Sequence, residues 1–262
     1  MDLGLDGKRV LVTGSTSGIG LAIAEQYLAE GASVVVQGLT EAETCFAVEN
    51  LSGGTRVCGI SADVSTSDGI RTIAEFALRD GPLDILVNNV GVYKVAEFAT
   101  LSDEAWSQIF DINVFSAVRL ARILLPLMLE RGTGSIINIA SEAGVKPLRQ
   151  MIHYSVSKTA LIGLNRALAE LTKGTRVHVN AILPGPTWTE GVRRYFEEFA
   201  AANGRSVCEV TSDYFSREEP TSLIQRFVQP EEVARLVVFV SAAEAMNGGA
   251  YRIEGGIIRS IL

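Results

Sequence analysis

The sequence predicts an α/β fold of one domain, a doubly wound parallel sheet of seven strands with helices on both faces. Two observations carry this prediction. Short runs rich in β-branched residues alternate with longer helical patterns along the whole chain, as they do where helices connect parallel strands. Several of these runs are apolar on both faces, which is typical of strands buried between two helical layers. No linker or repeat interrupts the alternation, so residues 1–262 are expected to form a single domain.

The expected elements follow from these patterns. Helical patterns include residues 19–31, 102–132 and 230–243. The segment 190–228 departs from the alternation, because it is long, rich in aromatic residues and follows the sixth strand. A segment of that length in a compact domain is usually functional. We therefore expect a lid over a substrate, with residues 191–201 as a short amphipathic helix. The expected strands are residues 8–13, 32–37, 56–61, 83–88, 134–140, 176–183 and 249–254.

The composition narrows the possible partners. The chain is 47% hydrophobic and 20% charged, with a net charge of −7. An acidic chain without a basic cluster is not expected to bind nucleic acid or an acidic membrane. The first residues lack the pattern of a signal peptide, and no uninterrupted apolar run has the length of a membrane span, so the protein is expected to be cytoplasmic.

Cysteine and histidine give no sign of a metal site. The three cysteines are scattered, and there are only two histidines, His153 and His178, so no metal ligand set is predicted. His178 lies in an alternating stretch that is typical of a strand. His153 directly precedes Tyr154, and two interpretations stay open for it: it faces the same cleft as Tyr154, or it has a structural role.

The first expected strand runs into TGSTSGIG, residues 13–20, and a helical pattern follows. Gly14, Gly18 and Gly20 permit a tight turn and a close approach of the backbone to a ligand. The start of the helix offers unpaired N–H groups and the positive end of its dipole to a pyrophosphate. A glycine-rich turn also suits any tight connection, but its position directly after the first strand favours a nucleotide site and a Rossmann-type fold.

A second motif lies in IHYSVSKTA, residues 152–160. Tyr154 and Lys158 are four residues apart, so in a helix they share one face, one turn apart. The pair alone is also compatible with an ordinary amphipathic helix that carries a tyrosine. The rest of the sequence has to supply the context.

That context is a resemblance to the short-chain dehydrogenase/reductase family, closest to bacterial members of the 3-oxoacyl-carrier-protein reductase type. Several independent motifs occur in the family's order, and together they span the whole chain. They are TGSTSGIG at 13–20, ADV at 62–64, NNVG at 88–91, Asn113 in DIN, Ser141, YSVSK at 154–158, PGPTWT at 184–189 and GG at 255–256.

The resemblance implies a catalytic set of Asn113, Ser141, Tyr154 and Lys158. Reduction of a ketone by hydride requires a proton for the developing alkoxide, and a phenol with a pKa of about 10 delivers it poorly without nearby positive charge. Lys158 is expected to lower the pKa of Tyr154 and to reach the cofactor ribose. Ser141 would hydrogen-bond the substrate oxygen and the phenol, and Asn113 would hold a water behind Lys158. Taken singly, Asn113 also fits a helix-interior amide and Ser141 a cap.

The resemblance also implies where the dinucleotide lies. The loop at 13–20 would hold the pyrophosphate, Asp63 would accept from the adenine amino group beside the Val64 backbone, and Asn89 would line the adenine ribose. The complete expected set of cofactor contacts is Gly14, Ser15, Ser17, Gly18, Ile19, Gly20, Asp63, Val64, Asn89, Gly91, Tyr154, Lys158, Thr187 and Thr189, the two threonines at the nicotinamide carboxamide.

Two departures from the family pattern concern the cofactor. Val90 stands where the family usually has alanine and would crowd the adenosine side slightly. The second strand ends in Gln37, Gly38 and Leu39, which include neither the acidic residue that selects NAD nor the arginine that selects NADP. The choice between NAD and NADP therefore stays open.

A modest preference for NADP(H) is expected, mainly because no carboxylate at 37–39 repels a 2′-phosphate. Gly38 would leave room for the extra group. The hydroxyls of Ser15, Ser17 and Thr40 could donate to it.

The function expected is that of an NAD(P)-dependent oxidoreductase that interconverts a secondary alcohol and a ketone, with Tyr154 as acid/base. A 3-oxoacyl-carrier-protein reductase is the alternative. A small free substrate is slightly favoured over a carrier-bound acyl chain, because the basic residues that could form a docking patch for a carrier protein are scattered. A non-catalytic dinucleotide-binding regulator is a third reading, disfavoured because a sensor need not retain the four catalytic residues together. The apolar closing residues suggest a homotetramer or homodimer. The basic candidates are Arg119, Arg122, Arg131, Arg149 and Lys173.

Overall fold

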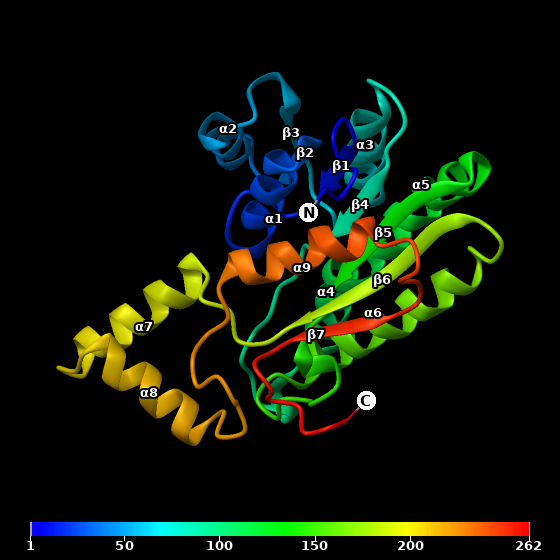
Figure 1. The fold of residues 1–262 in the computed structure, drawn as a ribbon. Coiled ribbons are helices and arrows are strands. Elements are labelled where there is room, and N and C mark those ends of the chain that lie inside the picture. Colours follow the sequence, from blue (N-terminus) through cyan, green and yellow to red (C-terminus); the bar gives the residue numbers. More distant parts are fainter. Residues whose placement is uncertain (1, 262) are drawn as a thin grey trace.

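The structure, a computed structural model, describes residues 2–261 and gathers seven strands into one sheet (Figure 1). The strands are β1 (Arg9–Val12), β2 (Ser33–Gly38), β3 (Val57–Ser61), β4 (Ile85–Asn88), β5 (Thr133–Ile139), β6 (Arg176–Pro184) and β7 (Ala250–Ile253). Their order is β3-β2-β1-β4-β5-β6-β7, and every neighbouring pair is parallel. Each strand overlaps the run expected for it, so the predicted seven-stranded doubly wound sheet is confirmed.

Helices cover both faces of this sheet (Figure 1). The helices are α1 (Gly18–Ala29), α2 (Glu41–Asn50), α3 (Ser67–Leu78), α4 (Asp103–Phe110), α5 (Ser116–Arg131), α6 (Ile152–Glu170), α7 (Glu190–Ala202), α8 (Val207–Arg217) and α9 (Pro230–Ala242). α1, α2 and α9 share an apolar core with one face, and α3, α5 and α6 with the other. In the first layer the buried Tyr27 of α1 donates its hydroxyl to Ser241 of α9 at 2.7 Å.

The strand order reverses direction at β1, which pairs with β2 on one side and β4 on the other. Connections that leave in opposite directions open a crevice beyond the carboxyl ends of the strands. Val12, the last residue of β1, is in register with Val87 of β4. The loops that begin at Thr13 and Asn89 therefore meet at this crevice.

The expected helical stretch 102–132 is two helices. α4 and α5 are joined by a π-helical turn, Asp111–Phe115. By length and composition alone, the continuous span Asp103–Arg131 would be long and apolar enough to cross a membrane. Half of its most apolar window is buried within this fold.

The segment 190–228 contains two helices rather than one (Figure 1). α7 confirms the helix expected at 191–201. α8 was not expected, although its start carries a capping box in which Ser206 and Glu209 bond each other's backbone, a pattern visible in the sequence as Ser-x-x-Glu. The two helices stand off from the sheet and pack on a small apolar cluster of their own: Phe196, Ala200, Val210, Phe215 and Phe227.

Candidate active site

Two glycines in the loop after β1 have the left-handed backbone conformation. Gly14 has φ +59° and Gly18 has φ +56°, in the region that favours glycine. At Gly20, in the first turn of α1, a Cβ atom would lie 2.2 Å from the carbonyl oxygen of Gly14. No side chain fits at this position. The backbone of the loop can therefore pack tightly and approach a ligand closely.

Two polar side chains hold this loop in place. Asn89 donates its amide nitrogen to the carbonyl oxygens of Thr13, at 2.9 Å, and Gly14, at 3.0 Å. Gln37 accepts from the N–H of Gly14 at 2.9 Å and donates to the carbonyl oxygen of Ala62 at 2.9 Å. The amide of Asn89 thus braces the loop, in addition to the ribose contact expected for it.

The start of α1 is suited to an anion. Ser17 is the N-cap residue, and its exposed side chain makes no capping hydrogen bond. The first N–H groups of a helix have no partner within the helix, and here the cap residue satisfies none of them through its side chain. The loop with Gly14, Gly18 and Gly20, here called the glycine cradle, leaves space for a ligand beside its backbone. Together with the N–H groups of Gly18, Ile19 and Gly20, it fits a pyrophosphate.

The loops after β3 and β4 lie along the same edge. Asp63 is exposed, and one of its carboxylate oxygens accepts the N–H of Ser65 at 2.8 Å, which leaves the other for a ligand donor. Val64 beside it is buried. Gly91 is exposed, and a Cβ atom there would lie 3.0 Å from the Nζ atom of Lys158, so the loop passes directly over this ammonium.

The end of β2 is more crowded than the sequence suggests. A Cβ atom at Gly38 would lie 2.3 Å from the hydroxyl of Thr44 and 2.6 Å from the methyl group of Thr16. The expectation that Gly38 leaves room for a 2′-phosphate is therefore wrong, because these two side chains fill that space. Thr40 caps α2 and donates its hydroxyl to the carboxylate of Glu43 at 2.9 Å.

The hydroxyl of Ser15 is also occupied. Ser15 is fully buried, donates to the carbonyl oxygen of Val12 at 2.6 Å and accepts from the N–H of Gln37 at 3.0 Å. Its side chain braces the loop and is not free to donate to a phosphate. Val90 contributes to the same packing, since its side chain would lie 2.8 Å from a Cβ atom at Gly14.

Lys158 of α6 is 3% exposed and donates its ammonium to the carbonyl oxygen of Ile139, the last residue of β5, at 2.8 Å. Burial lowers the pKa of Lys158 to about 8, and the carboxyl of Glu142 counteracts part of this effect.

The π-helical turn delivers Asn113 to the same place. Its side-chain oxygen accepts the N–H of Val92 at 2.8 Å, and its nitrogen donates to the carbonyl oxygen of Val92 at 2.9 Å and to the hydroxyl of Ser157 at 3.0 Å. Asn113 thereby ties the loop after β4 to α6. A π-helical turn inside a helix often marks a functional site.

Ser141 follows β5, and its hydroxyl is close to two acidic groups. Its oxygen accepts the N–H of Ala143 at 3.1 Å, and its proton is donated to the carboxyl of Glu142 at 2.6 Å. Ser141 also interacts with the phenol of Tyr154 and lowers its pKa. The ring of Tyr93 packs edge-on against that of Tyr154, with 6.1 Å between the ring centroids.

The surroundings of Tyr154 raise the pKa of its phenol. Burial has the largest effect, the carboxyl of Glu142 and the phenol of Tyr93 add to it, and the hydrogen bond to Ser141 opposes it. The lowering expected from Lys158 is not among these influences. The ammonium lies 5.8 Å from the ring centroid and is bonded to a backbone carbonyl.

The segment after β6 carries the two threonines expected at the carboxamide. Thr187 is buried and donates its hydroxyl to the carbonyl oxygen of Gly185 at 2.8 Å. Thr189 caps α7, and its methyl group would lie 3.3 Å from a Cβ atom at Gly18. Thr189, at the start of the segment 190–228, thus lies beside the phosphate loop.

The two histidines lie outside this group. His153 is 2% exposed, and its ring packs edge-on against Trp106 of α4, with 6.1 Å between centroids, which favours the structural interpretation. His178 is a β6 strand residue, and its Nδ1 atom lies 3.2 Å from the hydroxyl of Ser135. Within residues 2–261, no group of three or more histidine, cysteine or acidic side chains is placed to hold a metal ion.

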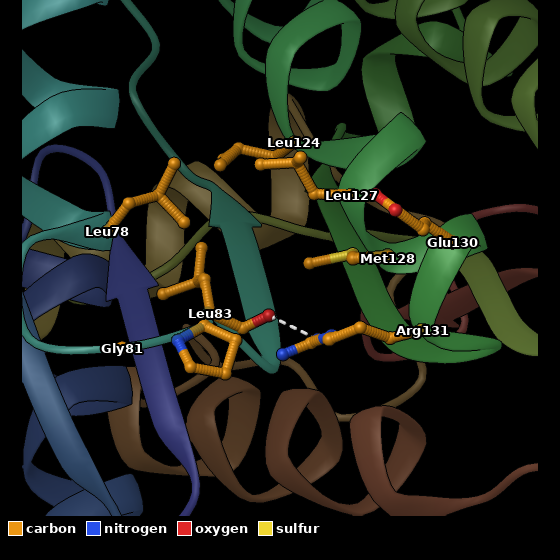
Figure 2. Close-up of a pocket in the computed structure, with 9 residues that line it drawn as sticks. Leu78, Gly81, Leu83, Leu124, Leu127, Met128, Glu130 and Arg131 are labelled. Carbon is orange, nitrogen blue, oxygen red and sulfur yellow. Dashed lines mark hydrogen bonds between the residues drawn. The ribbon is translucent and has the colours of Figure 1, made fainter.

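A pocket of about 340 Å³ lies at the opposite edge of the sheet (Figure 2). It is formed where β4 begins and α5 ends, and Arg131 donates there to the carbonyl oxygen of Leu83 at 2.7 Å. None of the expected site residues lines it.

The structure brings most of the expected residues to one crevice and adds three that the sequence reasoning missed. Gln37 was considered only for cofactor choice, yet it holds the phosphate loop. Ser157 supports Asn113, and Glu142 contacts Ser141. A glutamine in an otherwise apolar strand and a glutamate directly after Ser141 were the available signals, and Ser157 lies within the YSVSK motif, where no role was assigned to it.

Comparison with known proteins agrees with this geometry. The sequence profile of the short chain dehydrogenase family matches residues 8–199. The chain is 54% identical to the uncharacterized oxidoreductase YvrD of Bacillus subtilis, over all of both chains. It is 36% identical to D-beta-hydroxybutyrate dehydrogenase of Cupriavidus necator, over 96% of this chain and 98% of that one.

A solved structure of L-sorbose reductase from Gluconobacter frateurii, complexed with NADPH and L-sorbose, superposes over all of both chains with a TM-score of 0.94 and 35% identity. The chain therefore belongs to the short-chain dehydrogenase/reductase family and is an NAD(P)-dependent oxidoreductase of alcohols and ketones.

Proposed function

We propose that this enzyme interconverts a small secondary alcohol and a ketone, with Tyr154 as the acid/base. One observation carries the proposal: the buried ammonium of Lys158 lies 5.8 Å from the ring centroid of Tyr154, one helical turn away, and Ser141 interacts with the phenol. A ketone oxygen placed beside Tyr154 and Ser141 would accept a hydrogen bond from each and take its proton from the phenol.

The remaining residues would position this pair. Lys158 is held by Ile139 beneath the loop at Gly91, where its charge would stabilise the phenolate left after proton transfer. Asn113 fixes the loop and α6 relative to each other, and one lone pair of its oxygen stays available for a water behind Lys158.

The nicotinamide dinucleotide would supply or accept the hydride. Its pyrophosphate would lie on the glycine cradle and the start of α1, which leave space only for backbone. Asp63 and Val64 would contact the adenine, Asn89 and Gly91 the adenine ribose, and Thr187 and Thr189 the carboxamide.

Tyr154→Phe tests the acid/base. It removes the transferable proton and little else, so we expect turnover to fall by about 10² to 10⁴ while cofactor affinity stays close to wild type. Turnover is measured by nicotinamide absorbance on a panel of L-sorbose, acetoacetate and ethyl acetoacetate, and on the corresponding alcohols. Wild-type turnover in the phenylalanine variant would contradict the assignment.

A small free substrate is favoured over a carrier-bound acyl chain. Of the basic residues that could form a docking patch, Arg119 pairs with Asp111 at 2.7 Å, and Arg131 donates to the backbone at the opposite edge of the sheet. Turnover of a 3-oxoacyl group far faster on its carrier protein than as a free ester would favour the carrier-protein alternative. Dinucleotide binding without turnover of any ketone or alcohol would favour the regulator.

We also propose that residues 190–228 act as a substrate lid. α7 and α8 have a small core of their own, and an ion pair between Glu219 and Lys146 joins the segment to the stretch of chain that follows Ser141. At its end, the N–H of Leu223 donates to the carbonyl oxygen of Gly255 at 2.7 Å.

The same protein is proposed to be a cytoplasmic homotetramer or homodimer. Phe115, at the end of the π-helical turn, is exposed, as are Ile123 and Leu127 of α5, and the spacings of eight and four residues place all three on one side of the helix. Phe239 of α9, beside the edge strand β7, is exposed as well. Light scattering at micromolar concentration tests this, and a monomer would refute it.

NADP(H) remains the proposed preference, at a modest level. The support is the absence of a carboxylate at 37–39 and the NADPH in the similar L-sorbose reductase structure. The hydroxyl of Ser17 and the backbone at the start of α2 are the donors that this preference would use.

A further inference from the structure

The carboxyl of Glu142 has no part in the roles described above. It lies in a 3₁₀ turn, Glu142–Gly144, directly after Ser141, and is 6% exposed. Its Oε2 atom is 2.6 Å from the hydroxyl oxygen of Ser141. A buried carboxyl in contact with a residue that faces the substrate oxygen controls how that residue can bond.

The bonding capacity of Ser141 makes this control explicit. A hydroxyl has one proton to donate and two lone pairs that accept. One lone pair accepts the N–H of Ala143. An ionised Glu142 can only accept a hydrogen bond, so the Ser141 hydroxyl donates to it. A lone pair of Ser141 then faces the site. A protonated Glu142 can donate to that second lone pair instead, which frees the Ser141 proton for another acceptor.

A ketone oxygen is an acceptor only, so it needs Ser141 as a donor. We propose that Glu142 is a positioning residue that sets the direction of the Ser141 hydrogen bond, so that ketones are reduced by the form in which Glu142 carries its proton. This inference rests on the proposed function, because it assumes that the substrate oxygen lies between Ser141 and Tyr154.

The surroundings of Glu142 place its ionisation in the working pH range. Burial raises its pKa to about 7 and the nearby carboxyl of Glu219 adds to the rise, while the bond from Ser141 opposes it. Lys146 pairs with Glu219 on the side of the lid. The titratable groups that interact with Glu142 are Glu219, Tyr154, Lys158 and Tyr214.

The test compares Glu142→Gln with wild type across pH. The amide of glutamine can donate to Ser141 at every pH, so it mimics the protonated carboxyl. With saturating NADPH and the best-reduced ketone among L-sorbose, acetoacetate and ethyl acetoacetate, we measure kcat/KM for reduction. The ratio of variant to wild type should be near one at pH 6 and at least tenfold at pH 8.5, since loss of one donor to a developing oxyanion typically costs about 10² to 10³.

A ratio of variant to wild-type kcat/KM that falls as the pH rises would overturn the proposal. If the negative charge of Glu142 serves instead to keep Lys158 protonated, the ratio falls below one as the pH rises. A ratio that does not change with pH would also overturn it. In a Ser141→Ala background the substitution at 142 should no longer change the profile. Glu49→Gln, an exposed site on α2, removes the same charge and should leave the wild-type profile intact.

Two further readouts separate this inference from the proposed function. Carboxyl ¹³C shifts of labelled glutamate report the ionisation of Glu142 without turnover, and titration below pH 5 would overturn the proposal. Failure of the proposed function looks different. Tyr154→Phe would then keep its turnover, whatever the ratio of kcat/KM between Glu142→Gln and wild type.

Discussion

The ammonium nitrogen of Lys158 lies 2.8 Å from the carbonyl oxygen of Ile139, where β5 ends. This bond fixes a buried charge under the loop at Gly91, between the proposed acid/base and the proposed ribose position. A lysine on a helix is otherwise long and mobile, so the carbonyl of the neighbouring strand is what makes its position definite.

Lys158→Ala should therefore reduce both turnover and cofactor affinity. We expect kcat to fall by about 10² or more, because the phenolate of Tyr154 loses its neighbouring charge. NADPH binding, followed by fluorescence titration, should weaken as well. Lys8→Ala, at the opposite edge of the sheet, is the control. Unchanged NADPH affinity in the Lys158 variant would argue against a ribose contact.

Gly20→Ala should abolish cofactor binding while the fold persists. The added Cβ atom would lie 2.2 Å from the carbonyl oxygen of Gly14 and 2.5 Å from the amide nitrogen of Asn89, so the loop must shift. Gly163→Ala in α6 is the matched control, because it is also helical and has open space around it. That control should gain about 0.5 to 1 kcal/mol of stability with normal NADPH affinity. Equal NADPH affinity in both variants would show that the loop is not the binding cradle.

The sequence allowed the sheet, the strand positions and most residues of the crevice to be predicted, for a physical reason. Buried parallel strands such as β1 and β4 are short, largely apolar runs, and a glycine-rich turn directly after the first strand is typical of a nucleotide site. The sequence could not show which side chains fill the space beside a given residue, or which hydrogen-bonding groups already have partners. Some of the contacts that fill the space at Gly38 and occupy Ser15 come from residues distant in the chain. Thr16 of the loop after β1, for instance, blocks Gly38 at the end of β2.

The buried carboxyl of Glu142 should make stability depend on pH. Its pKa in the folded protein, about 7, is above the ordinary value of 4.5. The proton is therefore held more tightly in the folded state, so the stabilisation is complete below pH 4.5 and is lost as the pH rises through 7. At about 1.4 kcal/mol per pH unit, wild type should lose roughly 3 kcal/mol relative to Glu142→Gln between pH 4.5 and 8.

Urea unfolding of both proteins at pH 4.5 and pH 8 measures that difference. Parallel pH dependences would mean that Glu142 titrates normally. Because unfolding requires neither cofactor nor substrate, the result stands apart from any measurement of turnover.

Residues 190–228 should gain protection when the site is filled. Helices α7 and α8 pack on their own apolar cluster, whereas bonds from residues 219–228, among them the ion pair between Lys146 and Glu219, tie the segment to the rest of the fold. Hydrogen exchange of α7 and α8 should slow on addition of NADPH and a ketone from the panel, whereas that of α1 and α9, which pack on the sheet, should already be slow. Equal, strong protection of α7 and α8 with and without ligands would rule out a lid.

Cofactor preference should respond to two positions between the end of β2 and the first turn of α2. Leu39 is 67% exposed at the end of β2, so Leu39→Arg could place a charge beside a 2′-phosphate without disturbing the core, and NADP(H) efficiency should rise. Glu43 holds the hydroxyl of Thr40 at 2.9 Å and adds a negative charge nearby, so Glu43→Gln should also favour NADP(H), by a smaller factor. Gly38→Asp is unsuitable for the converse test, because its Cβ atom would meet Thr44 at 2.3 Å. The measurement is kcat/KM with both cofactors and one shared ketone. A wild-type preference for NAD(H) of tenfold or more, about 1.4 kcal/mol, would overturn the proposed preference.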